Sequence, residues 1–316
     1  MALTDQLTSF TKKYFLPVVV DNIYASNAMF VRLRSKAEPL DGGRQITQQV
    51  IYAQPTSVGT YRGMDTLDIA VSEEFTEANF DWAQYYASIV LDGRSDRINS
   101  GKTAVVNLLK AKMQNAEKSL KDLMGTHVLG SGTDTNGIVG LQAMIDDGTN
   151  TATYGSIDRT TYTWWKAKYA ANSGTGRQLT KYLMQNMFGQ CTIDNDRPTM
   201  LITSQLVFDK YYLMVDPQQR FGEESLAKAG FQNLLFNGRP IVVDSHVATP
   251  NSNHQIFFLN ENYVTLRYHQ DCNFIFVPFQ RPINQDAIVG KILWQGQMTS
   301  GACRMHGRLI DINPAL

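Results

Sequence analysis

Residues 284–298 read Asn284-Gln-Asp-Ala-Ile-Val-Gly-Lys-Ile-Leu-Trp-Gln-Gly-Gln-Met298, a stretch rich in the residue types that favour β-strands. Two similar stretches precede it, Asn233-Leu-Leu-Phe-Asn-Gly-Arg-Pro-Ile-Val-Val-Asp244 and Ile256-Phe-Phe-Leu-Asn-Glu-Asn-Tyr-Val-Thr-Leu-Arg-Tyr-His269. Gly, Pro and Asn separate these runs, as they do where turns join strands. The last quarter of the chain is therefore predicted to be β-rich. It contains almost nothing that resembles a catalytic centre.

The composition is that of a folded globular protein with one large or two modest domains. The chain has 316 residues, of which 43% are hydrophobic, enough for a substantial core. Lys and Arg together number 29, as do Asp and Glu, so the net charge is zero. This balance argues against a surface dedicated to binding nucleic acid. The apolar run Phe15–Val20 is too short for a membrane span. We expect a soluble protein made in a reducing cytoplasm.

The cysteines suggest neither a zinc site nor a disulfide framework. Cys191, Cys272 and Cys303 are odd in number, lie far apart and show no CxxC spacing. We predict that they are buried free thiols.

A projecting hairpin is predicted in the first third of the chain. From Arg44 the residues alternate, so that Ile46 and Val50 share one face of a strand. A tip rich in Gly, Thr and Ser follows, and Phe80–Leu91 is predicted to pair back along the first strand, although parts of this run also suit a helix. Such a hairpin is at best marginally stable alone, so the rest of the chain or a neighbouring subunit must cover it.

Helices and strands alternate in the middle of the chain. Apolar residues at steps of three and four predict a helix over residues 100–127, roughly 35 to 40 Å long. After it comes a compact α/β region. It is predicted to contain helices over 179–190 and 204–214 and apolar strands over 199–203 and 240–244.

No catalytic, cofactor or metal site is predicted. Gly101-Lys102-Thr103 opens a helix as a phosphate-binding loop does, but Asp96 stands where such a loop requires glycine. Asp244-Ser245-His246 has the residue types of a catalytic triad, yet neighbours on a strand point to alternate sides and cannot converge. The five histidines lack a spacing that suits a metal on one helix face.

Short motifs in a fixed order resemble the major capsid proteins of tailed double-stranded DNA bacteriophages. No single motif is diagnostic, but their joint order is fairly specific and covers residues 44–312. They are Phe80-Asp-Trp82, Asn99-Ser-Gly101, Ile157-Asp-Arg-Thr-Thr-Tyr-Thr-Trp-Trp165, Gln219-Arg-Phe221, Phe236-Asn-Gly-Arg-Pro-Ile-Val-Val-Asp244, Phe258-Leu-Asn260 and Asn284-Gln-Asp-Ala287.

The resemblance implies an α+β fold of the tailed-phage capsid type. Carried onto this sequence, it implies an arm, an extended β-hairpin loop, a peripheral domain with a long spine helix, an α/β axial domain, and strands that return to the peripheral domain. These parts occupy residues 1–43, 44–92, 93–138, 139–255 and 256–316, in that order.

The resemblance also implies a structural protein of the virion, made in the host cytoplasm, and not an enzyme. Its copies would form hexamers and pentamers of an icosahedral shell that encloses DNA without specific binding and has no membrane. Its other partners would be a portal protein at one vertex and, in some members, scaffolding and decoration proteins. Our candidates for intersubunit contact are Tyr61, Arg62 and Trp82, because aromatic residues and arginine are enriched in interface anchors.

One departure from the family concerns covalent linkage. Some members weld their shells through a lysine in the extended loop, and this chain has no lysine between Lys36 and Lys102. We therefore expect noncovalent contacts alone. Two rival hypotheses are a nucleotide hydrolase based on Gly101-Lys102-Thr103 and another ring-forming phage component, such as a tail or connector protein.

Overall fold

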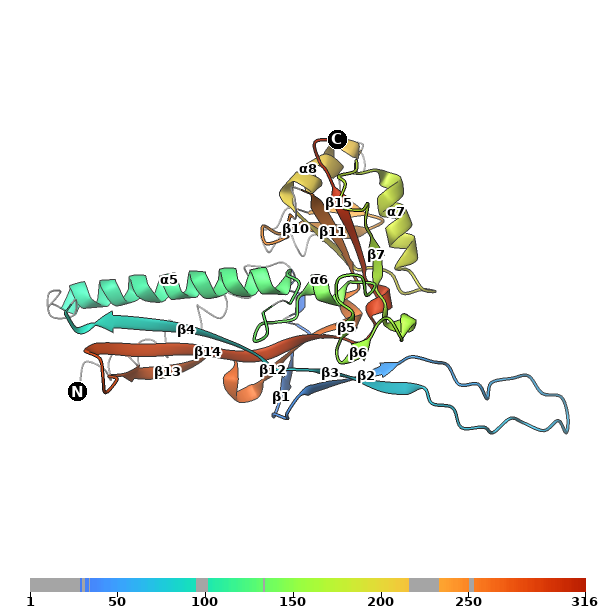
Figure 1. Ribbon diagram of the computed structural model, residues 1–316, viewed down its shortest axis with the longest axis horizontal. Coiled ribbons are helices and arrows are strands. Elements are labelled where there is room, and N and C mark those ends of the chain that lie inside the picture. Colours follow the sequence, from blue (N-terminus) through green and yellow to red (C-terminus); the bar gives the residue numbers. More distant parts are fainter. Residues whose placement is uncertain are drawn as a thin grey trace.

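The computed structural model describes residues 29, 32–33, 35–94, 102–132, 134–215, 233–249 and 253–316. Figure 1 shows three parts: an elongated body of long strands and one long helix, a compact α/β region above one end of that body, and a hairpin that projects away from it. The fold is α+β, as predicted.

The elongated body is built on one central strand. Strand β14 (Ala287–Ser300) pairs antiparallel with β4 (Ala83–Asp92) over all ten residues of β4. On its other side β14 pairs with β13 (Ile275–Gln280) and β12 (Val264–His269), and β1 (Glu38–Leu40) runs parallel to β12. These five strands form one sheet.

Helix α5 (Lys102–Val128) lies along β4 (Figure 1). Its 27 residues span about 40 Å at the usual rise per residue. The predicted helix is confirmed, but its apolar stripe differs from the predicted one. Met113, Leu120 and Met124 are buried, whereas Leu123, which the spacing placed on the buried face, is largely exposed.

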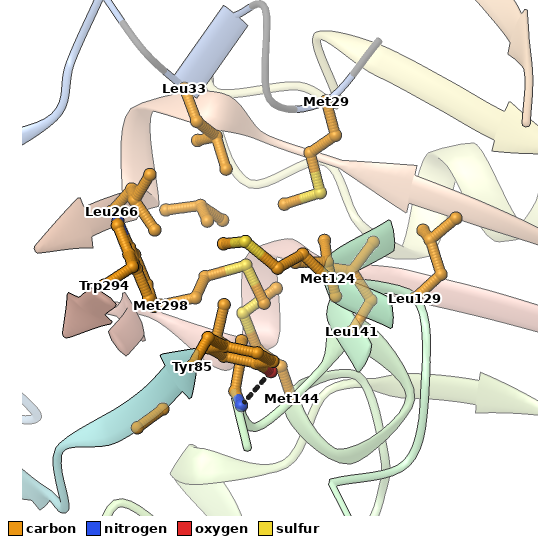
Figure 2. Close-up of a cluster of buried hydrophobic side chains, with 14 of the residues drawn as sticks. Met29, Leu33, Tyr85, Met124, Leu129, Leu141, Met144, Leu266, Trp294 and Met298 are labelled. Atoms are coloured by element: carbon orange, nitrogen blue, oxygen red, sulfur yellow. Dashed lines mark hydrogen bonds between the residues drawn. The ribbon is translucent and has the colours of Figure 1, made fainter. Parts of the chain in front are cut away.

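Methionines fill much of the core between α5 and the sheet (Figure 2). Met124 and Met144 meet Met298 and Trp294 of β14 in a single buried cluster. Unbranched thioether side chains suit such irregular gaps between a helix and a twisted sheet. Tyr85 adds a polar contact to this core.

The Tyr85 hydroxyl links three segments of the chain. It accepts a hydrogen bond from the Ile138 amide at 2.8 Å and lies 2.7 Å from Nδ1 of His127 (Figure 2 shows the first bond). Burial raises the pKa of Tyr85 well above its ordinary value, so the phenol keeps its proton. Its O–H donates a hydrogen bond to Nδ1 of His127 in the tautomer that leaves this nitrogen unprotonated. The end of α5 is thereby tied to β4.

The compact region is built on a six-stranded mixed sheet. Its strand order is β7 (Lys168–Ala170), β15 (Gly307–Ile312), β11 (His254–Leu259), β8 (Met200–Thr203), β10 (Arg239–Val243) and β9 (Asn233–Phe236). Helices α7 (Lys181–Gln190) and α8 (Gln205–Met214) pack on it through buried residues such as Met187 and Phe208. The predicted helices and strands of this region are confirmed.

Short elements connect the two sheets. They are α6 (Leu141–Met144), the paired strands β5 (Thr153–Tyr154) and β6 (Ile157–Asp158), and the 3₁₀ turns η2 (Thr163–Trp165), η5 (Glu261–Tyr263) and η7 (Cys303–Met305). A further 3₁₀ turn, η6 (Gln270–Cys272), joins β12 to β13 within the five-stranded sheet. Cys191 and Cys303 are buried free thiols as predicted, whereas the free Cys272 is only partly buried.

One predicted strand pairing is wrong. Residues 83–92 do form a strand, but β4 pairs with β14 and not with the first hairpin strand, because β14 offers it ten antiparallel positions. The strands after residue 255 were expected to return to the peripheral domain. Instead β11 and β15 pair with each other in the six-stranded sheet, and the predicted boundary at 255/256 falls inside β11.

A histidine bridges the helix of the body and the six-stranded sheet. Nδ1 of His246 lies 2.9 Å from Asp244, just after β10, and Nε2 lies 3.0 Å from Asp122 of α5. Both ring nitrogens face carboxylates, which accept hydrogen bonds only, so the protonated imidazole satisfies both. Burial by itself lowers the pKa of His246, but the two carboxylates outweigh it and the pKa lies above its ordinary value.

The bridge predicts a pH dependence of stability. Because the folded-state pKa of His246 is raised, its stabilising effect is complete below the ordinary value of 6.5 and is lost as the pH rises through the folded-state pKa. We expect His246→Gln to lower the free energy of unfolding by about 1 kcal/mol at pH 6, and by less at pH 8. Urea unfolding of the unassembled protein at both pH values measures this. A deficit that does not shrink with rising pH would contradict the charged bridge.

Candidate assembly surface

The projecting hairpin consists of β2 (Ile46–Ile51) and β3 (Phe75–Phe80), which pair antiparallel at all six positions. Its root is part of the body. Ile46 and Val50 of β2 and Ala78 and Phe80 of β3 are buried there in the main hydrophobic core. The predicted alternation of β2 is therefore confirmed, with one face buried.

Polar and aromatic contacts fix the hairpin root further. The Asn79 amide donates to the Gly155 carbonyl at 2.9 Å, and the Tyr52 ring stacks on Trp164 with 5.2 Å between centroids. Gly155 has a φ of +59°, and a Cβ there would lie 2.8 Å from the Phe80 ring, so this close approach requires glycine. The root is thus held rigidly.

The corner between β3 and β4 determines where the hairpin points. The Gln297 side-chain amide, which is buried, donates to the Asp81 carbonyl at 3.0 Å and accepts from the Val139 amide at 2.9 Å. Trp82 donates its indole N–H to the Gly43 carbonyl at 2.9 Å. Only Asp81 and Trp82 separate the two strands, so the hairpin continues outward from the body (Figure 1).

The hairpin tip, residues 52–74, exposes large apolar side chains that the described part of the chain does not cover. The exposed fractions of Leu67, Ile69 and Val71 are 58%, 89% and 99%. Others in and beside the tip are Ile51, Val58, Tyr61, Met64 and Phe75. Exposed apolar surface gathered on one projection is typical of an interaction site.

The structure separates the three predicted contact residues. Tyr61 and Arg62 lie in the tip, where the Arg62 amide donates to the Asp65 carboxylate at 2.8 Å and Gly63 completes the turn with a φ of +61°. Trp82 lies at the root corner instead, half-buried, with its ring 5.8 Å from that of His269. The structure brings together Tyr61 and Arg62 but not Trp82.

Three exposed apolar residues of the tip were not predicted as contacts from the sequence. Leu67, Ile69 and Val71 alternate with polar or small residues, which is the pattern of a strand. That signal was available, but the neighbouring Gly, Ser and Thr residues suggested a plain polar loop.

The described residues show little that could support catalysis. Ser204 and His254 make a 2.6 Å hydrogen bond, yet both are buried, and no carboxylate in the described residues bonds to the other ring nitrogen. Asp244 and His246 do meet, contrary to the sequence argument, because residues 244–246 form a turn and not a strand. Ser245 points to solvent.

Metal ligands, membrane-spanning helices and the Gly101-Lys102-Thr103 motif were also considered from the sequence. No group of His, Cys, Asp and Glu in the described residues could hold a metal ion, and no described helix is long and apolar enough to cross a membrane. Of the motif Gly101-Lys102-Thr103, Gly101 lies outside the described residues and Lys102 begins α5.

Comparison with solved structures identifies the fold. A capsid protein of cyanophage A-1(L) superimposes with a TM-score of 0.67 at 15% identity, covering 92% of this chain and 93% of that one. The chain has the fold of the tailed-phage capsid proteins. This capsid fold also matches a capsid protein of a native GTA particle, with a TM-score of 0.57 at 10% identity, covering 92% and 90% of the two chains.

The capsid fold extends to a further solved shell. The SrpI encapsulin of Synechococcus elongatus matches with a TM-score of 0.59 at 8% identity, covering 92% of this chain and 90% of that one. No family model and no curated protein sequence matches the chain. The match to the capsid fold therefore rests on the three-dimensional arrangement of the helices and strands.

The exposure of the tip predicts which substitutions the unassembled protein tolerates. Ile69→Ser and Val71→Ser should change the free energy of unfolding by less than about 0.5 kcal/mol, because these side chains already contact water. Val50→Ser, in the buried face of the same hairpin, should cost about 2 to 4 kcal/mol. Urea unfolding of the three variants measures this. Equal losses for Ile69→Ser and Val50→Ser would show that the tip is packed within one chain.

Proposed function

We propose that this chain is a major capsid protein whose copies assemble as hexamers and pentamers into an icosahedral shell around packaged double-stranded DNA. The observation that carries the proposal is the hairpin, which projects from a body of the capsid fold and presents apolar residues at its tip. Burying apolar surface is favourable by about 25 cal/mol per Å². In the assembly, a second copy of the chain buries the apolar side chains of the tip.

The parts of the molecule take the following roles in the proposal. The hairpin is the extended loop, and α5 is the spine helix of a peripheral domain that includes the five-stranded sheet. The region around the six-stranded sheet is the axial domain, which faces the axis of the capsomer. The arm, residues 1–43, lies mostly outside the described residues.

The contacts between copies are head-to-tail in this proposal. A hairpin that reaches a different surface of the next copy makes a heterologous interface, and such interfaces close into rings. Obligate interfaces of this kind bury about 2,000 to 5,000 Å². Tyr61 and Arg62 in the tip, and Trp82 at the root, remain our candidates for intersubunit contact.

Other components follow from the same proposal. A portal protein occupies one vertex, and scaffolding and decoration proteins are further candidate partners. The shell is held by noncovalent contacts, because the tip has no lysine. The balanced net charge fits a wall that encloses DNA without gripping it.

Electron microscopy of the expressed protein tests the proposal. We expect capsomers or closed shells, whereas a connector gives rings of one size and a hydrolase gives small compact particles. ATP hydrolysis that is lost in Lys102→Ala would favour the hydrolase and overturn the capsid assignment. Enclosure of DNA is tested separately, by nuclease-protected DNA in particles purified from cells that produce the virus.

Shortening the hairpin should abolish assembly and leave the chain folded. The Tyr52 amide donates to the Glu74 carbonyl at 3.0 Å, so these residues already face each other, and an Asn-Gly turn can replace residues 53–73. A larger deletion over 44–92 would also remove β4 from the five-stranded sheet and is unsuitable. Circular dichroism checks the fold and sedimentation velocity checks assembly. Intact shells from the shortened chain would refute the role of the hairpin.

A further inference from the structure

Strand β4 has a free edge. Antiparallel strands direct the backbone groups of alternate residues to opposite sides. The Gln84 amide donates outward to Asn136, and the Val90 carbonyl accepts outward from Lys112, so Tyr86 and Ser88 between them also direct their amides and carbonyls away from β14. In the part of the chain that the structure describes, nothing pairs with these backbone groups of Tyr86 and Ser88.

A groove runs along this free edge, between β4 and helix α5. It has a volume of about 420 Å³ and is lined by residues 86–90 of β4 and by residues of α5 that include Lys112 and Leu123. Tyr86, Val90 and Leu123 are exposed apolar side chains in it. The groove thus combines unpaired strand edge with apolar surface, as sites that accept an added strand do.

The chain also contains a strand-like segment without a partner. Residues 66–72 of the tip have the alternating pattern of a strand but belong to no helix or sheet, and Leu67, Ile69 and Val71 present their side chains to water. Seven residues in a strand span about 23 Å. The outer edge of β4 from residue 84 to residue 90 has the same number of residues.

Charge favours the match between the segment and the groove. The segment is flanked and interrupted by acids only, namely Asp65, Asp68, Glu73 and Glu74. The groove is lined by one charged side chain, Lys112 of α5, and by no acidic residue among those described. Opposite charges on two surfaces steer them together and fix their register.

The two surfaces of one chain cannot meet each other. The hairpin points away from the end of the body where β4 and α5 run side by side (Figure 1). A hairpin tip that fills this groove must therefore come from a second copy.

We propose that residues 66–72 of one copy add as a strand to the free edge of β4 in the next copy, with Leu67, Ile69 and Val71 in the groove against α5. The amides and carbonyls of Tyr86 and Ser88 then gain partners. Lys112 exchanges the Val90 carbonyl for a carboxylate of the incoming segment, which is the stronger hydrogen-bond acceptor. This inference rests on the proposed function, because it names where the hairpin of a shell subunit docks.

Disulfide trapping in assembled particles tests the contact. In a Cys272→Ser background, which removes the one thiol that is not buried, Ser88→Cys is combined in turn with Thr66→Cys, Ala70→Cys and Ser72→Cys. These side chains lie on the same face of the added strand as Ser88 when Leu67, Ile69 and Val71 face α5. After oxidation with copper–phenanthroline we expect a ladder of linked chains on nonreducing denaturing gels for at least one pair. The matched control is Ser88→Cys with Val58→Cys, an exposed tip position outside the segment, which should stay monomeric on the gel.

The outcomes separate this inference from the function on which it rests. Shells that form but give no ladder with any of the three pairs, or that give one only with Val58→Cys, overturn the docking site and leave the capsid function standing. A parent protein that forms no assembly at all overturns both.

Discussion

The pairing of β4 with β14 is the constraint on which the rest of the structure depends. Ten consecutive pairs fix β4 along the central strand β14, and Asp81 and Trp82 connect it directly to the hairpin. Gln297 of β14 holds this corner through the Asp81 carbonyl. The position of β4 in the body therefore sets the direction of the hairpin. Helix α5 follows the opposite end of β4 in the chain and packs along it.

The outward hairpin has a surface that the described part of the chain does not bury. The root is packed around Phe80 and Val50, whereas the tip leaves Ile69 and Val71 in water. While these side chains contact water, they contribute no hydrophobic stabilisation. In the proposed function this hydrophobic free energy is gained when another copy buries them, so no covalent bond between copies is required.

The sequence predicted local features well and long-range pairing poorly. The helix at α5 follows from periodicity within a single segment, and so does the buried face of Ile46 and Val50. Alternation shows that β4 is a strand but not which strand it joins, since any antiparallel partner suits it. The same holds for β15, which pairs with β11 in the other sheet. Trp82 was proposed as a contact because of its residue type, which does not show that it lies at the corner between β3 and β4.

The central claim is that the tip is covered only when copies assemble. Hydrogen–deuterium exchange measured by mass spectrometry compares residues 66–72 in the unassembled chain and in shells. We predict fast exchange in the unassembled chain, where the amides of Leu67, Ile69 and Val71 have no partner in the described residues, and strong protection in shells. Equally fast exchange in both states would contradict the account.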